Sequence, residues 1–182
     1  MRAYLTLTRR ELASFFLSIS GYVIISGLTL LVGLDFVTLL NNLGNEPVFL
    51  PITQVFFNNL LLWIIIVLTA PVITMRLFAL EKASGTFETL TTTPVGDAQI
   101  VAAKFTAALI FFIVMWLPTL GCMFIVGHFA NQPGALDKGT LGSMYTGLLL
   151  AGGFILSIGS FASALTKSQV VAGMITLVGG IG

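Results

Sequence analysis

Long stretches of this chain carry no charged side chain. They are separated by small clusters that hold all 15 Asp, Glu, Lys and Arg residues of the 182 in the sequence. Because a helix needs roughly 20 apolar residues to cross a hydrocarbon core of about 30 Å, four of these stretches are long enough to span a membrane. They run over residues 12–34, 47–75, 105–136 and 139–166.

The shortage of charge excludes several classes of protein. Charged residues make up 8% of the chain, against about 25% in a soluble domain. A mean hydropathy of +1.04 excludes intrinsic disorder, which combines low hydrophobicity with high charge. A net charge of +1 without a basic stripe argues against nucleic-acid binding. The bilayer is therefore the expected solvent.

Within these stretches we expect four membrane-spanning helices and part of a fifth. The four expected spans are residues 14–36, 57–76, 105–127 and 142–165. The last apolar stretch, 168–182, is short, and a helix that ended inside a bilayer would leave its final carbonyl groups without partners. We therefore expect an incomplete fifth span in a single all-α transmembrane domain over 1–182.

Lys and Arg are distributed asymmetrically between the two sides of the expected bundle. Seven of the eight lie on the side that holds segments 1–13 and 77–104, and only Lys138 lies on the other. By the positive-inside rule the first side is cytoplasmic. The sequence predicts a multi-pass protein with a cytoplasmic N-terminus, and the first span is too long for the core of a cleaved secretory signal.

Segment 1–13 shows the pattern of a helix that lies along a membrane surface. Apolar and aromatic side chains fall on one side of a helical projection: Tyr4, Leu5, Leu12, Phe15 and Phe16. Arg2, Arg9 and Arg10 fall on the opposite side, where they would face anionic head groups. Such a helix could act as a lever into the first span, or the arginines could only fix the topology.

The cytoplasmic segment 77–104 carries the most informative pattern. Glu81, Gly85, Glu88 and Thr92 follow at i, i+4, i+7 and i+11, which places them on one face of a helix. This stripe predicts a short helix parallel to the membrane whose carboxylates suit cationic groups of a partner. Glycine costs a helix about 1 kcal/mol relative to Ala, which would fit a close approach to the backbone at Gly85. A loosely ordered, solvated loop is the alternative.

Small residues follow a four-residue step along the expected fourth span. They are Ser143, Gly147, Ala151, Gly159 and Ser163. Small side chains let helix backbones approach closely in lipid, where close packing replaces the hydrophobic effect. We predict that this stripe packs against other helices, within the subunit or between subunits. A place along a substrate path is the alternative.

No motif predicts catalysis or metal binding. The sequence has no Gly-Lys-Ser or Gly-Lys-Thr phosphate-binding loop, no G-x-S-x-G elbow around Ser160, and no second zinc ligand at a suitable spacing from His128. Cys122 is the single cysteine and has no disulfide partner within the chain. We expect no catalytic, cofactor-binding or metal site. No charge lies in the middle of a span, so an external energy source is favoured over a proton-driven carrier.

Segment 71–105 resembles the ABC-2 type permeases, and among them the permease associated with gliding motility in some bacteria. The elements that carry the resemblance are Thr-Met-Arg (74–76), Glu-x-x-x-Gly-Thr-x-Glu (81–88) and Pro-x-x-Asp-x-Gln-Ile-Val (94–101). Similar stretches at 9–16, 117–120 and 158–173 extend the likeness over most of the chain.

The resemblance implies a type V exporter-like helical bundle, with six membrane helices in the full-length subunit, in a bacterial cytoplasmic membrane. It implies two permease subunits per transporter, identical or paralogous, and a separate subunit that binds ATP and magnesium. It also implies that Glu81, Gly85, Thr86 and Glu88 belong to a coupling helix docked on that ATPase. Leu80 departs from the pattern, because many relatives carry Glu at this position, and the change would alter docking.

Together these features predict the permease subunit of an ATP-driven exporter, which is a transport subunit and not an enzyme. A second hypothesis is a membrane scaffold that works with an ATPase partner in motility or envelope machinery and moves no cargo. The sequence leaves the cargo open.

Overall fold

The computed structural model describes residues 2–43, 52–85, 96–129 and 138–181, and these residues form helices with no strand among them. The helices are α1 (Arg2–Phe16), α2 (Ile19–Leu43), α3 (Ile52–Phe57), α4 (Leu60–Thr74), α5 (Ala79–Ser84), α7 (Asp97–Phe129), α8 (Lys138–Leu165) and α9 (Gln169–Ile181). Four described stretches are long and apolar enough to cross a membrane: Ile19–Asn41, Leu60–Ser84, Asp97–Ile125 and Lys138–Leu165. The expected fold class, an all-α polytopic bundle, is confirmed.

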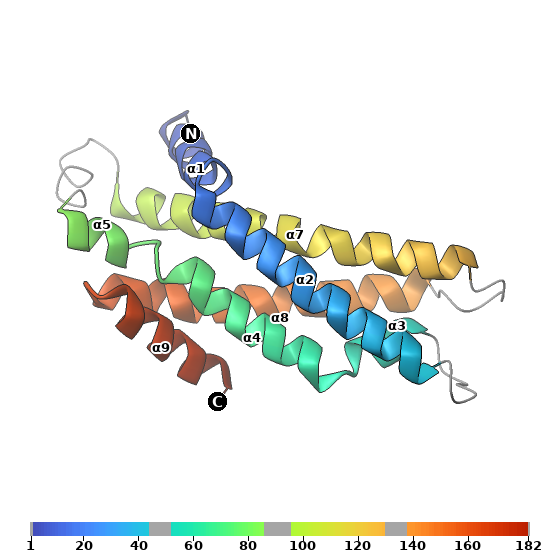
Figure 1. The fold of residues 1–182 in the computed structure, drawn as a ribbon. Coiled ribbons are helices and arrows are strands. Elements are labelled where there is room, and N and C mark those ends of the chain that lie inside the picture. Colours follow the sequence, from blue (N-terminus) through green and yellow to red (C-terminus); the bar gives the residue numbers. More distant parts are fainter. Residues whose placement is uncertain (1, 44–51, 86–95, 130–137, 182) are drawn as a thin grey trace.

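The long helices lie side by side along a common direction, with α9 against α4 and α8 (Figure 1). α4 contacts α2, α8 and α9, while α7 contacts α1, α2 and α8. α1 and the short helix α5 lie at the end of the bundle where α7 begins and where α4 and α8 end (Figure 1). We call this the α1–α5 end.

Aromatic side chains fill the centre of the bundle. Phe111 and Phe112 of α7 are fully buried, and the ring of Phe15 stacks on Phe111 with the centroids 4.9 Å apart. The outer faces are also apolar, as in Ile19 and Phe154, which are 84% and 67% exposed. A surface of this kind suits surrounding lipid and not water.

Two glycines of α8 allow neighbouring side chains to approach closely. A Cβ atom on Gly152 would lie 2.2 Å from Cζ of Phe112, and one on Gly159 would lie 2.3 Å from Oγ1 of Thr74. Both distances are far below a van der Waals contact, so only glycine fits at these two positions. Close packing of α8 on α4 and α7 therefore depends on them.

The small-residue stripe predicted along α8 does not stay on one face. A four-residue step advances the helix by more than one turn and drifts by about 40° each time. Gly159 and Ser163 are buried, whereas Ser143 and Gly147 are exposed and Ala151 is half-buried. A Cβ atom on Gly147 would meet no atom within 4 Å. Within this chain, only the second half of the stripe lies between helices.

A sharp junction separates α1 from α2. The Ser18 side chain caps α2 by accepting a hydrogen bond from the Gly21 N–H at 3.1 Å. A Cβ atom on Gly21 would lie 1.9 Å from the carbonyl oxygen of Phe15, so the junction requires glycine. The first apolar stretch is therefore divided, and its long helix begins at Ile19, not at residue 14.

Candidate functional site

The ion pairs of the described chain gather at the α1–α5 end. They join Arg10 and Glu11 of α1, Glu81 of α5 and Lys104 of α7. We call these four residues the charge cluster. Its members come from three helices that are far apart in the sequence, so the cluster exists only in the folded chain.

Lys104 is the centre of the charge cluster. Its side chain is 1% exposed, and its Nζ donates to Oε2 of Glu11 at 3.1 Å and to Oε1 of Glu81 at 2.7 Å. The Phe78 ring lies below the ammonium, with its centroid 5.5 Å from Nζ. Removing an ammonium group from water costs several kcal/mol. The two carboxylates therefore make the buried position of Lys104 stable.

Arg10 completes the cluster from its outer side. Its Nη2 lies 3.4 Å from Oε1 of Glu11 and 3.7 Å from Oε1 of Glu81. The Arg10 side chain is 59% exposed, and exposed pairs contribute less than about 1 kcal/mol. The strong links are thus the two through Lys104, which join α7 to α1 and to α5.

The N-terminus of α5 is attached to α8. The backbone N–H groups of Phe78 and Ala79 both donate to Oγ of Ser163, at 3.1 Å each. Ser163 thus supplies from another helix the oxygen that an N-cap residue normally provides. Lys82 adds a second link, because its Nζ donates to the carbonyl oxygen of Ala164 near the C-terminus of α8. Although α5 has only six residues, it contacts α1 through Arg10, α7 through Lys104 and α8 through Ser163.

Gly85 ends α5 in the left-handed conformation, with φ of 74°. A Cβ atom there would meet nothing within 4 Å. No atom of the described chain approaches Gly85 closely, so an approach by a partner stays a prediction, and the positive φ of a helix C-cap already favours glycine here. The prediction of one continuous helical stripe is wrong, because α5 stops at Ser84. Thr86 and Glu88 lie outside the described residues.

Glu81 makes an intramolecular contact that the sequence analysis did not foresee. Its carboxylate is directed to Lys104, whereas the helical projection assigned it to a face for a partner. Ser163 was predicted only as a packing residue, and it is also the cap of α5.

Glu11 was not among the predicted site residues, although the sequence contains a signal for it. Tyr4, Thr8, Glu11 and Phe15 recur at i, i+4, i+7 and i+11, which is the spacing of a buried helix face. Thr8, Glu11 and Phe15 are buried. The Tyr4 hydroxyl lies 2.8 Å from Oγ1 of Thr106 on α7. α1 is therefore packed on α7. Because Glu11 lies on the packed face, its buried carboxylate needs a cation nearby, and Lys104 provides it.

A second polar link lies toward the opposite end of the bundle. Asp35 of α2 is 2% exposed, and its Oδ1 accepts a hydrogen bond from Nδ2 of Asn59 at 2.5 Å. Asn59 also caps α4, because its Oδ1 accepts from the Leu61 N–H at 3.3 Å. One side chain thus fixes the start of α4 and joins it to α2. In the ranges that the structure describes, no three His, Cys, Asp or Glu residues are grouped as a metal site would require.

Comparison with known proteins agrees with this architecture. Residues 7–179 match a family model described as ABC-2 family transporter protein. No curated protein and no solved structure was found to match the chain. The match covers nearly the whole length, including all the helices that form the bundle and the charge cluster. The chain therefore belongs to the ABC-2 family of transporter proteins, as a multi-pass permease subunit of an ABC transporter.

Proposed function

We propose that this permease drives export with energy from a separate subunit that binds ATP and magnesium. In this proposal the protein lies in a bacterial inner membrane. Its α1–α5 end faces the cytoplasm, as the excess of Lys and Arg on that side predicts. The segment that starts with α5 and leads into α7 docks on the ATPase. The observation that supports this role most directly is the attachment of α5 to α8 through Ser163, to α7 through Lys104 and to α1 through Arg10.

The links of α5 are strong enough to carry a displacement. Separating a buried ion pair costs about 3–5 kcal/mol, whereas the coupling free energy between two allosteric sites is typically about 1–3 kcal/mol. A movement of α5 imposed from outside would therefore shift Lys104 and Glu11 with it before their contacts broke. Ser163 would pass the same movement to α8.

Two permease subunits, identical or paralogous, would form the pathway, as the resemblance to ABC-2 permeases implies. Ser143 and Gly147 are exposed on α8 and are available for packing against the second subunit. The cargo is left open, and the likeness to the gliding-motility permease stays a prediction. A scaffold that binds an ATPase but moves nothing is the competing hypothesis.

Purification of the full-length protein from its native membrane in mild detergent tests the proposal. We expect an ATP-binding subunit to co-purify, and its rate of ATP hydrolysis in the complex to change when Ser163→Ala removes the cap of α5. Ser157→Ala is the matched control, because the hydroxyl of this exposed serine donates to the Phe154 carbonyl of its own helix and to no other described helix.

Two results would contradict the proposal. The absence of any co-purifying ATP-binding subunit would remove the basis for ATP-driven export. A wild-type rate of ATP hydrolysis in the Ser163→Ala complex would show that α5 does not couple to α8. A cellular phenotype that survives with a hydrolysis-deficient ATPase subunit would favour the scaffold.

A further inference from the structure

A pocket of about 250 Å³ lies where the α1–α2 junction meets the end of α4. Its lining is mostly apolar, but it includes the polar side chains of Ser14, Ser18, Ser20, Glu11 and Arg76. Hydroxyl groups and a guanidinium around a space of this size are suited to oxygen atoms of an anion. The role proposed above makes no use of this pocket.

Arg76 retains hydrogen-bonding capacity in the pocket. Its Nη1 donates to Oγ of Ser20, and its Nε is buried without an acceptor. Among the described residues Arg76 forms no ion pair. A guanidinium with an unused N–H beside a cavity is a favourable donor to a phosphate oxygen. The hydroxyls of Ser18 and Ser20 lie 2.9 Å apart on the same wall. Ser18 already donates to the carbonyl oxygen of Phe15 at 3.3 Å, so of these two hydroxyls only that of Ser20 has a hydrogen that can turn to an anion.

The electrostatic surroundings also favour an anion. Glu11 lines the pocket, but its two oxygens lie near Arg10 and Lys104. Glu11 is therefore compensated by two cations outside the lining. Arg76, the other charged residue of the lining, has no carboxylate partner among the described residues. Arg76 is thus the charge in this pocket that an anion would compensate.

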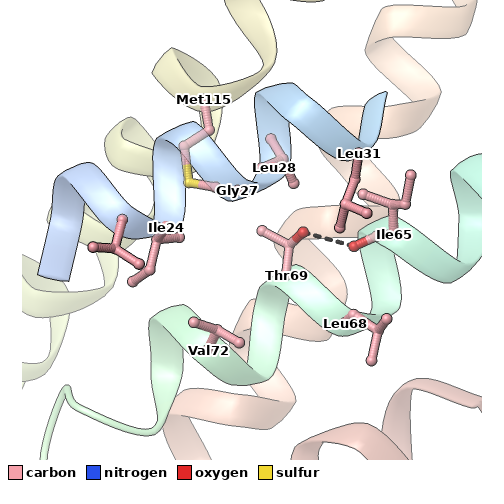
Figure 2. A pocket seen from close by; sticks show the side chains of 10 residues that line it. Ile24, Gly27, Leu28, Leu31, Ile65, Leu68, Thr69, Val72 and Met115 are labelled. Atoms are coloured by element: carbon pink, nitrogen blue, oxygen red, sulfur yellow. Dashed lines mark hydrogen bonds between the residues drawn. The ribbon is translucent and has the colours of Figure 1, made fainter. Parts of the chain in front are cut away.

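An apolar groove continues from this pocket along the bundle. Ile24 lines both cavities, and the groove has a volume of about 260 Å³. Figure 2 shows α2 and α4 forming its two sides, with Gly27 and Leu31 on α2, Ile65 and Leu68 on α4, and Met115 from α7. The Thr69 hydroxyl donates to the Ile65 carbonyl at 2.6 Å, so the groove offers little polar surface (Figure 2).

The length of the combined site matches half of a bilayer. Ser20 contacts Arg76 at one end, and Leu31 and Ile65 line the other. Eleven residues of helix rise about 16 Å, whereas the hydrocarbon core of a bilayer is about 30 Å thick. Leu31 and Leu68 are about half exposed, so the groove is open to the surroundings of the bundle.

We propose that the pocket and the groove together bind one phospholipid. Its phosphate lies against Arg76 and the serine hydroxyls, and one acyl chain lies between α2 and α4. An anion alone would leave the apolar groove without a function, and an uncharged alkyl chain would leave the Arg76 donor without an acceptor. The inference rests on the membrane location of the chain and is independent of ATP-driven export.

Native mass spectrometry of the full-length protein in mild detergent, titrated with phosphatidylglycerol, tests this site. Arg76→Gln removes the cationic donor, and Gly27→Leu fills the groove. A Cβ atom on Gly27 would meet nothing within 4 Å, so the larger side chain is compatible with folding. We expect each change to raise the dissociation constant of the one lipid bound per chain by about tenfold or more. Loss of a charge-assisted hydrogen bond in Arg76→Gln, or of acyl-chain burial in Gly27→Leu, produces an effect of this size.

Matched controls separate this site from general lipid adhesion. Arg9→Gln removes an exposed cation of α1 that does not line the pocket. Gly33→Leu makes the same substitution on α2 outside the groove, where a Cβ atom also meets nothing within 4 Å. Both controls should retain the lipid as the wild type does.

Three results would overturn the inference. Wild-type lipid retention in both Arg76→Gln and Gly27→Leu would show that no specific site exists. An equal loss in the Arg9→Gln control would show that only net charge matters. Inorganic phosphate that displaces the lipid, and that binds wild type and Gly27→Leu equally, would identify a site for a free anion. Thermal unfolding of each variant confirms that the protein compared is folded.

Discussion

Replacement of Lys104 by Met tests whether the charge cluster holds α1, α5 and α7 together. Methionine keeps most of the length and the apolar stem of lysine but lacks the ammonium group. In the variant Glu11 and Glu81, whose oxygens both lie within 3.1 Å of Nζ in the wild type, lose their shared cation. Among the described residues, the exposed side chain of Arg10 is then the cation that remains beside them.

The expected loss of stability follows from the burial of these groups. The Glu11 and Glu81 side chains are 8% and 18% exposed, so solvent screens them weakly. Removing one partner of a buried ion pair destabilises a protein by about 3–5 kcal/mol, because a charge stays buried without compensation. We therefore expect Lys104→Met to lower the free energy of unfolding by about 3–5 kcal/mol.

A triple variant separates the cost of an unpaired charge from the loss of contacts. Glu11→Gln, Glu81→Gln and Lys104→Met together remove all three buried charges and leave side chains of similar size. Neutral replacement of a whole buried ion-pair group is often without cost or even stabilising. The triple variant should therefore be more stable than Lys104→Met alone.

Denaturant unfolding in detergent, followed by tryptophan fluorescence, measures both differences. Lys167→Met is the control, because this lysine is exposed and forms no described ion pair. If Lys104→Met unfolds like this control, the cluster does not stabilise the fold. If the triple variant is less stable than the single one, the burial argument is refuted.

Three further substitutions test other contacts by the same unfolding measurement. Gly159→Leu should destabilise by about 3 kcal/mol through overpacking, because even its Cβ would lie 2.3 Å from Oγ1 of Thr74. Asn59→Ala should cost about 2–4 kcal/mol, since it removes the cap of α4 and the hydrogen bond to buried Asp35. Gly85→Ala should cost about 1 kcal/mol, because a left-handed φ is strained for any residue with a Cβ.

Each of these substitutions has a matched control in the chain. Gly147→Leu places the same side chain where no atom lies within 4 Å, and it should change stability little. Asn58→Ala alters an exposed neighbour of Asn59. Gly121→Ala, inside α7 and free of contacts, should stabilise by up to about 1 kcal/mol because it raises helix propensity. Equal effects in variant and control would contradict the assigned contact.

The membrane-spanning character of the chain could be predicted from the sequence, because it depends only on local composition. A charged group in hydrocarbon is costly wherever its helix packs, so the charge-free stretches alone indicated the spans. The same stretches were less informative about helix ends. The break before Ile19 depends on a serine cap and on the space around Gly21, and hydropathy records neither.

A short helix around Glu81 could be predicted from the sequence, but its contacts could not. The sequence located a short acidic element around Glu81 between two spans, and the structure has α5 there. The helical pattern then assigned Glu81 to an outside partner, because periodicity shows which residues share a face and not what that face meets. Gly85 was assigned to the helix interior, although its φ belongs to a helix end.

Tertiary structure alone decided which residues hold α5. Lys104 lies 93 positions from Glu11 and 23 from Glu81, and Ser163 lies 84 or more positions from the N–H groups that it caps. The residue type of a lysine does not show whether its ammonium group faces water or two buried carboxylates. In the same way, the residue type of a serine does not show whether it only fills space between helices or also caps one of them. Local sequence thus determined the solvent in which this chain folds, whereas pairing among distant polar groups became visible only when the helices were packed together.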